Sequence, residues 1–343
     1  MLLTIGNLIK LCQPRYMVKP MIAFLSLIFC ICCARPANQE QHTPHILTTL
    51  EERDLIPEGT AYDPVTEQVF ISSMYKRKIV AIRKDGSHYD FAKEASDDLW
   101  ATFGMEVDPL RRKLWVISSK GEGGILTQIK IEDGSWDSQL YCYDLDSSSL
   151  IRKYAVLASV PKGYCFNDLT VASNGDVYIT ESLTNKIFIL QHGADSINVI
   201  FEPSGYTFLN GITLTGDEKS LIVSSTESLL RINLETKSIT LLPYNAPIKQ
   251  RPIDGLTYYN NSLIGHQSNN LTLFYLNEQE DSILTYQIID TSGLDSSTTG
   301  EIGEDGWYYY IANSQIRSGI DYDKMIIMPM DSLEPVVIKK LRL

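Results

Sequence analysis

Four oxygen-bearing side chains each open a short motif whose second residue is glycine or aspartate. The motifs are Glu58-Gly59, Asn167-Asp168, Asn210-Gly211 and Asp254-Gly255. Carboxylate and carboxamide oxygens are hard ligands, of which Ca²⁺ takes about six to eight. The absence of histidine and cysteine from these positions argues against zinc or copper, while magnesium or manganese stays open. Asn-Gly and Asp-Gly are also ordinary turn dipeptides, so the set gains meaning only if the fold brings its members together.

The four motifs belong to a longer series of similar segments. The first residues of successive segments are 45, 64, 43, 44 and 45 positions apart. Each segment is followed by a turn rich in Asp, Pro, Asn, Gly or Glu and then by a second apolar run, such as Leu221-Ile222-Val223-Ser224. The segments begin at Glu58, Phe103, Asn167, Asn210, Asp254 and Thr299.

This repeat predicts the fold. Short β-rich runs in a unit of about 40 to 50 residues are typical of four-stranded blades. We therefore expect an all-β protein with a six-bladed β-propeller over residues 46–343, and the alternative is a β-sandwich with accidental spacing. The first strand of each blade lines a central channel, so equivalent positions meet at one mouth. The long interval indicates an insertion around 120–142 that could cover one side of a pocket.

Closure of the ring needs a strand from the other end of the chain. The last segment begins near Thr299 and leaves little chain after it. An open ring would expose two unpaired sheet edges. We expect the N-terminal strand Ile46-Leu47-Thr48-Thr49-Leu50 to form the outer strand of the last blade.

The motifs also resemble those of a known family. Pro57-Glu58-Gly59, Phe166-Asn167-Asp168, Leu209-Asn210-Gly211 and Ile253-Asp254-Gly255 are similar to motifs of the senescence marker protein/gluconolactonase family, which includes regucalcin. They also resemble those of its more distant relatives, the paraoxonases and squid-type organophosphatases. The resemblance spans about residues 50–320.

The resemblance implies roles for these residues. Glu58, Asn167, Asn210 and Asp254 would hold a catalytic divalent cation, usually Ca²⁺, and the protein would hydrolyse a lactone or related ester. In the gluconolactonase branch the aspartate ligand, here Asp254, is also implied as the base. Gluconolactonases usually carry a substrate-contacting arginine two residues before the asparagine of the third motif, where this chain has Cys165. The resemblance thus supports hydrolysis of a lactone in general better than it supports hydrolysis of a sugar lactone.

His266 is a second candidate catalytic residue. It follows Asp254 by twelve positions, and paraoxonases have a histidine at about this place in the equivalent blade. A neutral imidazole there could act as a general base near pH 7. The alternative is a hydrogen-bonded histidine at the rim with no part in catalysis.

Composition limits the partners. The chain has 343 residues, 44% of them hydrophobic and 21% charged, with a net charge of −12. A protein this acidic repels phosphate backbones, so nucleic acid and anionic membrane surfaces are not expected partners. We expect a monomer that acts on a small-molecule substrate and contacts a membrane only through a leader or lipid anchor.

Residues 1–35 are interpreted as an export leader. The uncharged run Met21–Cys33 is too short to span a membrane and fits the apolar region of a signal peptide. Cys30, Cys32 and Cys33 leave open a lipoprotein leader, plain cleavage after Ala34 or a short uncleaved anchor. Residues 36–45 would form a tether. The protein is thus expected to be periplasmic, secreted or lipid-anchored to a bacterial membrane.

An oxidising compartment would permit a disulfide between Cys142 and Cys165, and two unpaired buried thiols are the alternative.

Two functions follow as hypotheses. The first is an exported metal-dependent, gluconolactonase-like hydrolase of a lactone or related ester. The second is a non-catalytic propeller that binds a ligand or protein, as in the insect yellow and royal jelly proteins. The fold alone cannot choose between these two functions. The set of oxygen ligands favours the enzyme, and the missing arginine favours the binding protein.

Overall fold

The computed structural model describes residues 42–121, 135–156, 163–244, 252–303 and 306–343. The leader 1–35 and most of the predicted tether lie outside the described residues. Within the described part, no helix is long and apolar enough to cross a membrane.

The described residues form six four-stranded antiparallel sheets, as predicted. The first three consist of β2 (Pro57–Asp63), β3 (Gln68–Ser73), β4 (Lys78–Ile82) and β5 (His88–Ala92); β6 (Ala101–Asp108), β7 (Lys113–Lys120), β8 (Asp137–Asp144) and β9 (Leu150–Ala155); and β10 (Phe166–Val171), β11 (Val177–Glu181), β12 (Lys186–Leu190) and β13 (Asn198–Phe201).

The other three sheets complete the ring. They consist of β14 (Ile212–Leu214), β15 (Ser220–Ser224), β16 (Leu229–Asn233) and β17 (Ile239–Leu241); β18 (Leu256–Tyr259), β19 (Ser262–His266), β20 (Leu271–Leu276) and β21 (Ile283–Asp290); and β22 (Gly300–Ile302), β23 (Trp307–Ile311), β26 (Val336–Arg342) and β1 (His45–Leu50).

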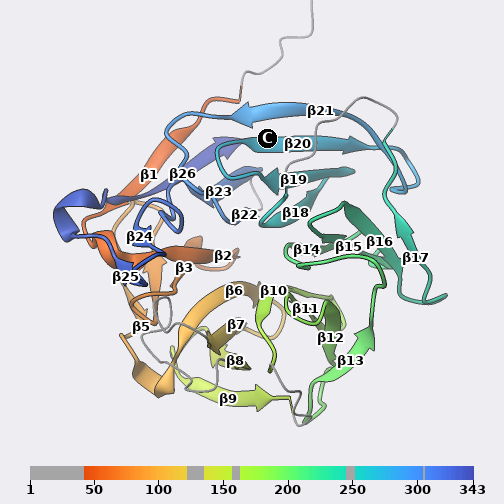
Figure 1. Cartoon of the computed structure of the whole chain (residues 1–343), viewed down its shortest axis with the longest axis horizontal. Helices are drawn as coiled ribbons and strands as arrows, with labels where there is room; N and C mark the ends of the chain where they lie inside the picture. Colours follow the sequence, from red (N-terminus) through yellow and green to blue (C-terminus); the bar gives the residue numbers. More distant parts are fainter. Residues whose placement is uncertain (1–41, 122–134, 157–162, 245–251, 304–305) are drawn as a thin grey trace, which may run out of the picture. The chain divides into compact units, whose positions relative to one another are not determined.

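These sheets are the blades of a six-bladed propeller (Figure 1). The first strands β2, β6, β10, β14, β18 and β22 lie innermost, and each contacts the first strand of the next blade, with β22 contacting β2. Apolar side chains of facing strands fill the space between blades, as where Phe70 and Phe91 of the first sheet pack with Met105 and Tyr143 of the second. The chain therefore forms one closed ring.

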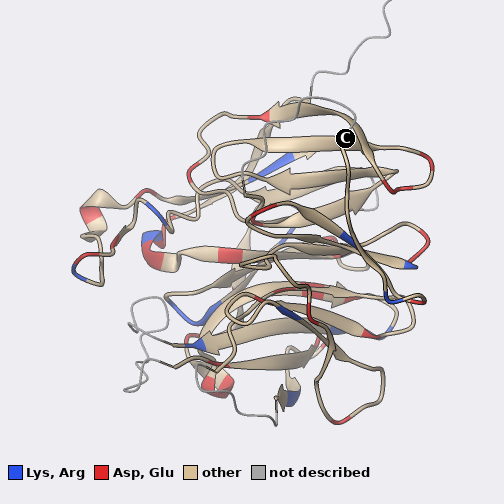
Figure 2. Ribbon diagram, turned by 45° about the vertical axis from the view of Figure 1, so that its right-hand side comes forward, with Lys and Arg blue, Asp and Glu red and all other residues tan. Residues whose placement is uncertain are grey.

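Side chains that begin the tight turns help to define the strand ends. Asp63 accepts hydrogen bonds from the Val65 amide at 3.1 Å and the Thr66 hydroxyl at 2.6 Å. Asn233 accepts in the same way from the Glu235 and Thr236 amides. Such bonds satisfy the turn backbone and stop the strand. Acidic residues recur in turns and at strand ends in Figure 2, which places much of the negative charge at the surface.

The predicted closure is confirmed. β1 pairs with β26 in antiparallel register, with Leu50 opposite Val336, and takes the outermost place in the last blade (Figure 1). Leu50 and Val336 pack in one buried cluster with Val69 and Ile71 of β3. The two ends of the described chain thus meet in one sheet and pack on the first blade.

The cysteines beyond the leader are unpaired. Cys142 in β8 and Cys165, just before β10, are both buried and free. Burial raises the pKa of the Cys142 thiol to about 11, because the thiolate would lose its hydration there. The alternative of two buried thiols is the one observed.

Candidate functional site

The four predicted ligand residues line one cavity of about 350 Å³. Glu58 and Asn167 are the second residues of β2 and β10, and Asn210 and Asp254 lie two residues before β14 and β18. All four therefore lie at the N-terminal ends of innermost strands. We call this space the motif cavity.

Hydrogen bonds orient the two carboxamides. The Asn210 Nδ2 donates to Asp254 Oδ1 at 2.8 Å, and the Asn167 Nδ2 donates to the Ser182 hydroxyl at 3.0 Å. Since each amide nitrogen is engaged, each amide oxygen stays available as an acceptor or ligand.

Two of the oxygens in this set have no partner. Glu58 is 4% exposed and Asn167 is 7% exposed, yet Glu58 Oε2 and Asn167 Oδ1 accept no hydrogen bond from any described residue. Buried acceptors without a partner are costly and uncommon, and they often mark the place of an ion or water. These atoms come from the residues predicted to hold a cation, so the side chains fit a hard divalent ion.

The carboxyl groups of the motif cavity resist ionisation. The pKa of Glu58 is raised well above its usual value, first by desolvation and then by the negative charges of Asp254 and Asp168. Burial raises the pKa of Asp254 to about 6, against the opposing effects of the Asn210 hydrogen bond and the positive charge of Arg317. A cation would reverse both shifts because it favours the charged forms.

A search for groups of His, Cys, Asp and Glu side chains alone would not find this candidate metal site. Among the described residues, no three His, Cys, Asp or Glu side chains are grouped to hold a metal. The set has only two carboxylates, and its other two members are carboxamides. The fit to Ca²⁺ therefore rests on the carboxamide oxygens as much as on the carboxylates.

Backbone contacts between neighbouring blades fix the motif residues. The amides of Gly211 and Gly255 donate at 2.7 Å to the carbonyls of Asp254 and Thr298. A Cβ on Gly255 would lie 2.5 Å from the Thr298 carbonyl oxygen. The second residue of this motif is glycine because the strands approach so closely.

The same hydrogen bonds correct the predicted register of the sixth blade. Thr298, and not Thr299, lines the motif cavity, and its hydroxyl donates to the Glu58 carbonyl at 2.8 Å. Thr299 lines a different cavity, although its hydroxyl donates to the same Glu58 carbonyl. The sequence pattern Thr299-Gly300 matched the other motifs, but a shift of one residue exchanges the two faces of a strand.

His266 lies apart from the motif cavity. Its side chain is fully buried, with Nδ1 2.8 Å from the Ser297 hydroxyl and Nε2 2.8 Å from the Tyr308 hydroxyl. Burial lowers the pKa of the imidazole to about 3. The His266 carbonyl accepts from the Asp254 amide at 2.8 Å. His266 is therefore hydrogen-bonded but buried and not at the rim, and its backbone holds Asp254 in place.

Loops between the blades form the walls of the motif cavity. Trp136, from the predicted insertion around 120–142, is one wall residue, although 122–134 lie outside the described residues. The segment between β23 and β26 carries a small hairpin, β24 (Ile320–Asp321) with β25 (Ile326–Ile327), and supplies Ile316, Arg317 and Tyr322. Leu183 and Phe208 complete the rim. The sequence reasoning missed Arg317, Tyr322 and Phe208. The one signal for Arg317 and Tyr322 was the length of chain between the apolar runs of the last blade, and Phe208 lies in the segment between β13 and β14.

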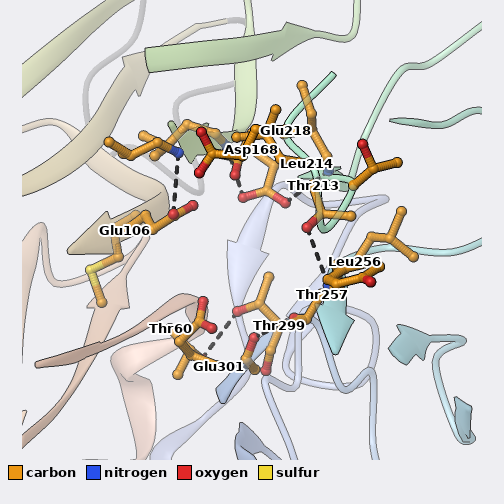
Figure 3. Close-up of a pocket in the computed structure, with 18 of the residues that line it drawn as sticks. Thr60, Glu106, Asp168, Thr213, Leu214, Glu218, Leu256, Thr257, Thr299 and Glu301 are labelled. Carbon is orange, nitrogen blue, oxygen red and sulfur yellow. Dashed lines mark hydrogen bonds between the residues drawn. The ribbon is translucent and has the colours of Figure 1, made fainter. Parts of the chain in front are cut away.

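A second cavity, also about 350 Å³, lies farther along the same innermost strands. Its lining includes Glu106, Asp168, Glu301 and several threonines (Figure 3), and we call it the acidic cavity. Glu106 accepts from the Val171 amide at 3.1 Å. Burial raises the pKa of Asp168 and that of Glu301 to about 7. Asp168 follows Asn167 in its motif, but the sequence reasoning did not single out this cluster.

The propeller is shared with solved structures, although no protein-family model and no curated protein matches the chain. A gluconolactonase from Xanthomonas campestris superposes with a TM-score of 0.59 at 14% identity, over 88% of this chain and 90% of its own. Regucalcin from Agrobacterium tumefaciens, described as a calcium-binding protein, gives 0.59 at 12% identity, over 87% and 95%. Virginiamycin B lyase from Staphylococcus aureus gives 0.57 at 16% identity, over 88% and 99%.

These likenesses confirm the fold expected from the motifs, that of the gluconolactonase and regucalcin propellers. Identities this low show the fold alone. Because the same fold also carries a lyase, the activity of this chain must be argued from its own side chains.

Proposed function

We propose that this protein is a divalent-cation-dependent hydrolase of a lactone or related ester. The observation that carries the proposal is the grouping of Glu58, Asn167, Asn210 and Asp254 around one cavity, with a buried unpartnered oxygen on Glu58 and on Asn167. These four residues would hold Ca²⁺ or another divalent ion, which, when bound, supplies a Lewis acid for the ester carbonyl.

Asp254 is the residue placed to move a proton. Its Oδ1 is fixed by the Asn210 amide and its backbone by the His266 carbonyl. In the proposed step a water oxygen bonds to the carbonyl carbon while its proton passes to the Asp254 carboxylate. The ring C–O bond then breaks and the leaving oxygen takes the proton, which gives a hydroxy acid.

The surrounding side chains would limit access of bulk water to this step. Met74, Phe103 and Ile253 are buried and line the cavity. An apolar lining strengthens electrostatic interactions inside a site because it lowers the local dielectric. The alternative function, a propeller that only binds its ligand, would keep the same cavity without turnover.

The test is turnover with and without the cation. Residues 36–343, which include every described strand, would be assayed with a panel of lactones and aryl esters in CaCl₂ and in chelator. We expect hydrolysis that needs Ca²⁺ and falls at least about 100-fold in Asp254→Ala. Asp331→Ala, at an exposed site away from the cavity, is the matched control. Calcium binding without turnover would support the binding protein, and absence of both would reject the site.

We also propose that residues 1–35 direct export. The support is the uncharged run Met21–Cys33 between basic residues. Fractionation of bacteria that express the full chain should find it outside the cytoplasm, and a chain that starts at residue 36 should stay inside. A full-length protein that remained cytoplasmic would contradict this.

A further inference from the structure

Large apolar side chains are exposed around the mouth of the motif cavity. Leu183, Phe208 and Tyr322 line the cavity and are 39%, 53% and 48% exposed. They come from separate parts of the chain, after β11, before β14 and in the turn after β24. Apolar side chains gathered at a cavity from several loops are typical of a binding surface for an apolar group.

Phe208 keeps its exposed position in an unusual backbone conformation. Its φ is 52°, in the left-handed region that bulky residues rarely adopt. Its amide donates to the Asn185 side chain at 2.6 Å, and the preceding Thr207 is bonded to the Glu227 carboxylate. The ring is half exposed, so core packing does not account for it. Strain of this kind is concentrated at ligand-contact sites.

Arg317 brings a positive charge to the same mouth. It lines the cavity and donates to the Ser268 hydroxyl. No ion pair formed by the described residues includes it. Its charge reaches Asp254, whose pKa it lowers. The guanidinium therefore has unused donors at the opening of the site.

The charge balance favours an anionic ligand once a cation is present. Glu58 and Asp254 contribute two negative charges, which a divalent cation offsets. The charge of Arg317 is then left over, and a guanidinium pairs with a carboxylate through two parallel hydrogen bonds. Cys165, at the place where gluconolactonases usually have an arginine, also lines this cavity.

We propose that the motif cavity takes an amphipathic ester or lactone, whose apolar group lies against Leu183, Phe208 and Tyr322 and whose carboxylate is bound by Arg317. This inference rests on the proposed function in one respect, that the bound molecule is hydrolysed. The predicted ligand chemistry, an apolar group with one negative charge, can be tested without turnover.

The kinetic test uses two esters that differ only in charge, 4-nitrophenyl hydrogen adipate and its methyl ester, with Ca²⁺ present. We expect native kcat/KM to be at least about tenfold higher for the anionic ester, because charge-assisted contacts contribute at about this level. Arg317→Met should remove the preference, so that the ratio of the kcat/KM values for the two esters falls to about one. Phe208→Gly, which suits the positive φ, should lower kcat/KM about tenfold for both esters.

Matched variants control for side effects. Arg83 is exposed and, like Arg317, donates to a serine hydroxyl, that of Ser87, but does not line the cavity. Lys237 has a φ of 64° on an outer turn. Arg83→Met and Lys237→Gly should have the same kcat/KM as the native protein for the anionic and for the neutral ester. Equal use of the two esters by the native protein, or a preference kept in Arg317→Met, would overturn the inference.

A binding test separates this inference from the proposed function. Calorimetry would compare 4-phenylbutyrate with 4-phenylbutanol in CaCl₂. We expect the carboxylate to bind at least about tenfold tighter to the native protein and no tighter than the alcohol to Arg317→Met. If the carboxylate binds tighter as expected but no ester is hydrolysed, the proposed hydrolase function is rejected and the proposed anion-binding site is supported. Equal binding of the two probes, or no binding of either, would overturn the anion site even if esters were hydrolysed.

Discussion

The two cavities of the propeller are built from the same innermost strands but differ in how their polar groups are satisfied. In the motif cavity, Glu58 and Asn167 each keep a buried oxygen without a hydrogen-bond partner in the described part of the chain. In the acidic cavity, Asp168 accepts from the Leu169 amide and Glu301 from the Ile302 amide, both through their own strands. The volumes are alike, and the acidic cavity is lined by four carboxylates against two in the motif cavity, so neither volume nor negative charge distinguishes the motif cavity as a binding site. The unpartnered oxygens do.

The two cavities are lined by different residues of the same innermost segments. Asn167 and Asp168 are adjacent in β10 and line different cavities. Successive side chains of a strand point to opposite faces. In the blades that begin with Glu58, Asn210 and Asp254 a glycine follows, and the acidic cavity is lined by the residue after that glycine, which is Thr60, Ile212 or Leu256.

The largest expected effect comes from opening the ring that holds both cavities. Deleting residues 46–56 removes β1 and the buried side chains of Leu50, Leu55 and Ile56, which are 2%, 1% and 0% exposed. Each large buried side chain contributes about 2 to 5 kcal/mol. We expect the melting temperature to fall by more than about 10 °C in calorimetry. An unchanged value would show that closure by β1 does not stabilise either cavity.

The next effect should separate the two cavities by activity. Glu58→Gln removes a carboxylate of the motif cavity and should lower Ca²⁺-dependent turnover about 100-fold. Glu301→Gln, the matched change in the acidic cavity, should alter turnover less than about threefold. Steady-state kinetics on the same ester measures both. Equal losses would mean that the two cavities act as one site.

A smaller effect should appear in thermal stability. Calcium at about 100 times its dissociation constant should stabilise the native protein by about 2.7 kcal/mol. Thermal melts of native protein should therefore shift upward by a few degrees, and those of Glu58→Gln should not. If the shift survived in Glu58→Gln but vanished in Glu301→Gln, the cation would bind in the acidic cavity instead.

The smallest effect is a pH dependence from the acidic cavity. Burial raises the folded-state pKa of Glu301 from 4.5 to about 7, so between these values the folded protein binds more protons than the unfolded chain. The contribution of Glu301 to stability is therefore lost as the pH rises through this window. We expect Glu301→Gln to melt a few degrees above native at pH 8 and equal to native at pH 5. The exposed Glu334→Gln should show no such difference.

Much of the fold and of the candidate site followed from the sequence, because the repeat encodes equivalent strand positions. The six segments predicted the blades, the closing strand and the grouping of Glu58, Asn167, Asn210 and Asp254. The sixth register was wrong by one residue, since Thr299-Gly300 matched the glycine motifs, whereas Thr298 lines the motif cavity and accepts the hydrogen bond from the Gly255 amide. His266 was placed in the correct strand, but its burial depended on Ser297 and Tyr308 of the next blade.

The sequence by itself determined which residues recur at the inner end of each blade, because the period of the repeat and the alternation of a strand are local properties. Only the tertiary structure decided what surrounds them. Arg317, Phe208 and Tyr322 reach the motif cavity through loops whose paths depend on packing between blades. Glu106 and Glu301 approach each other because ring closure places distant strands around one axis. Contacts between residues so far apart in the chain carry no local pattern, so they appear only once the ring has formed.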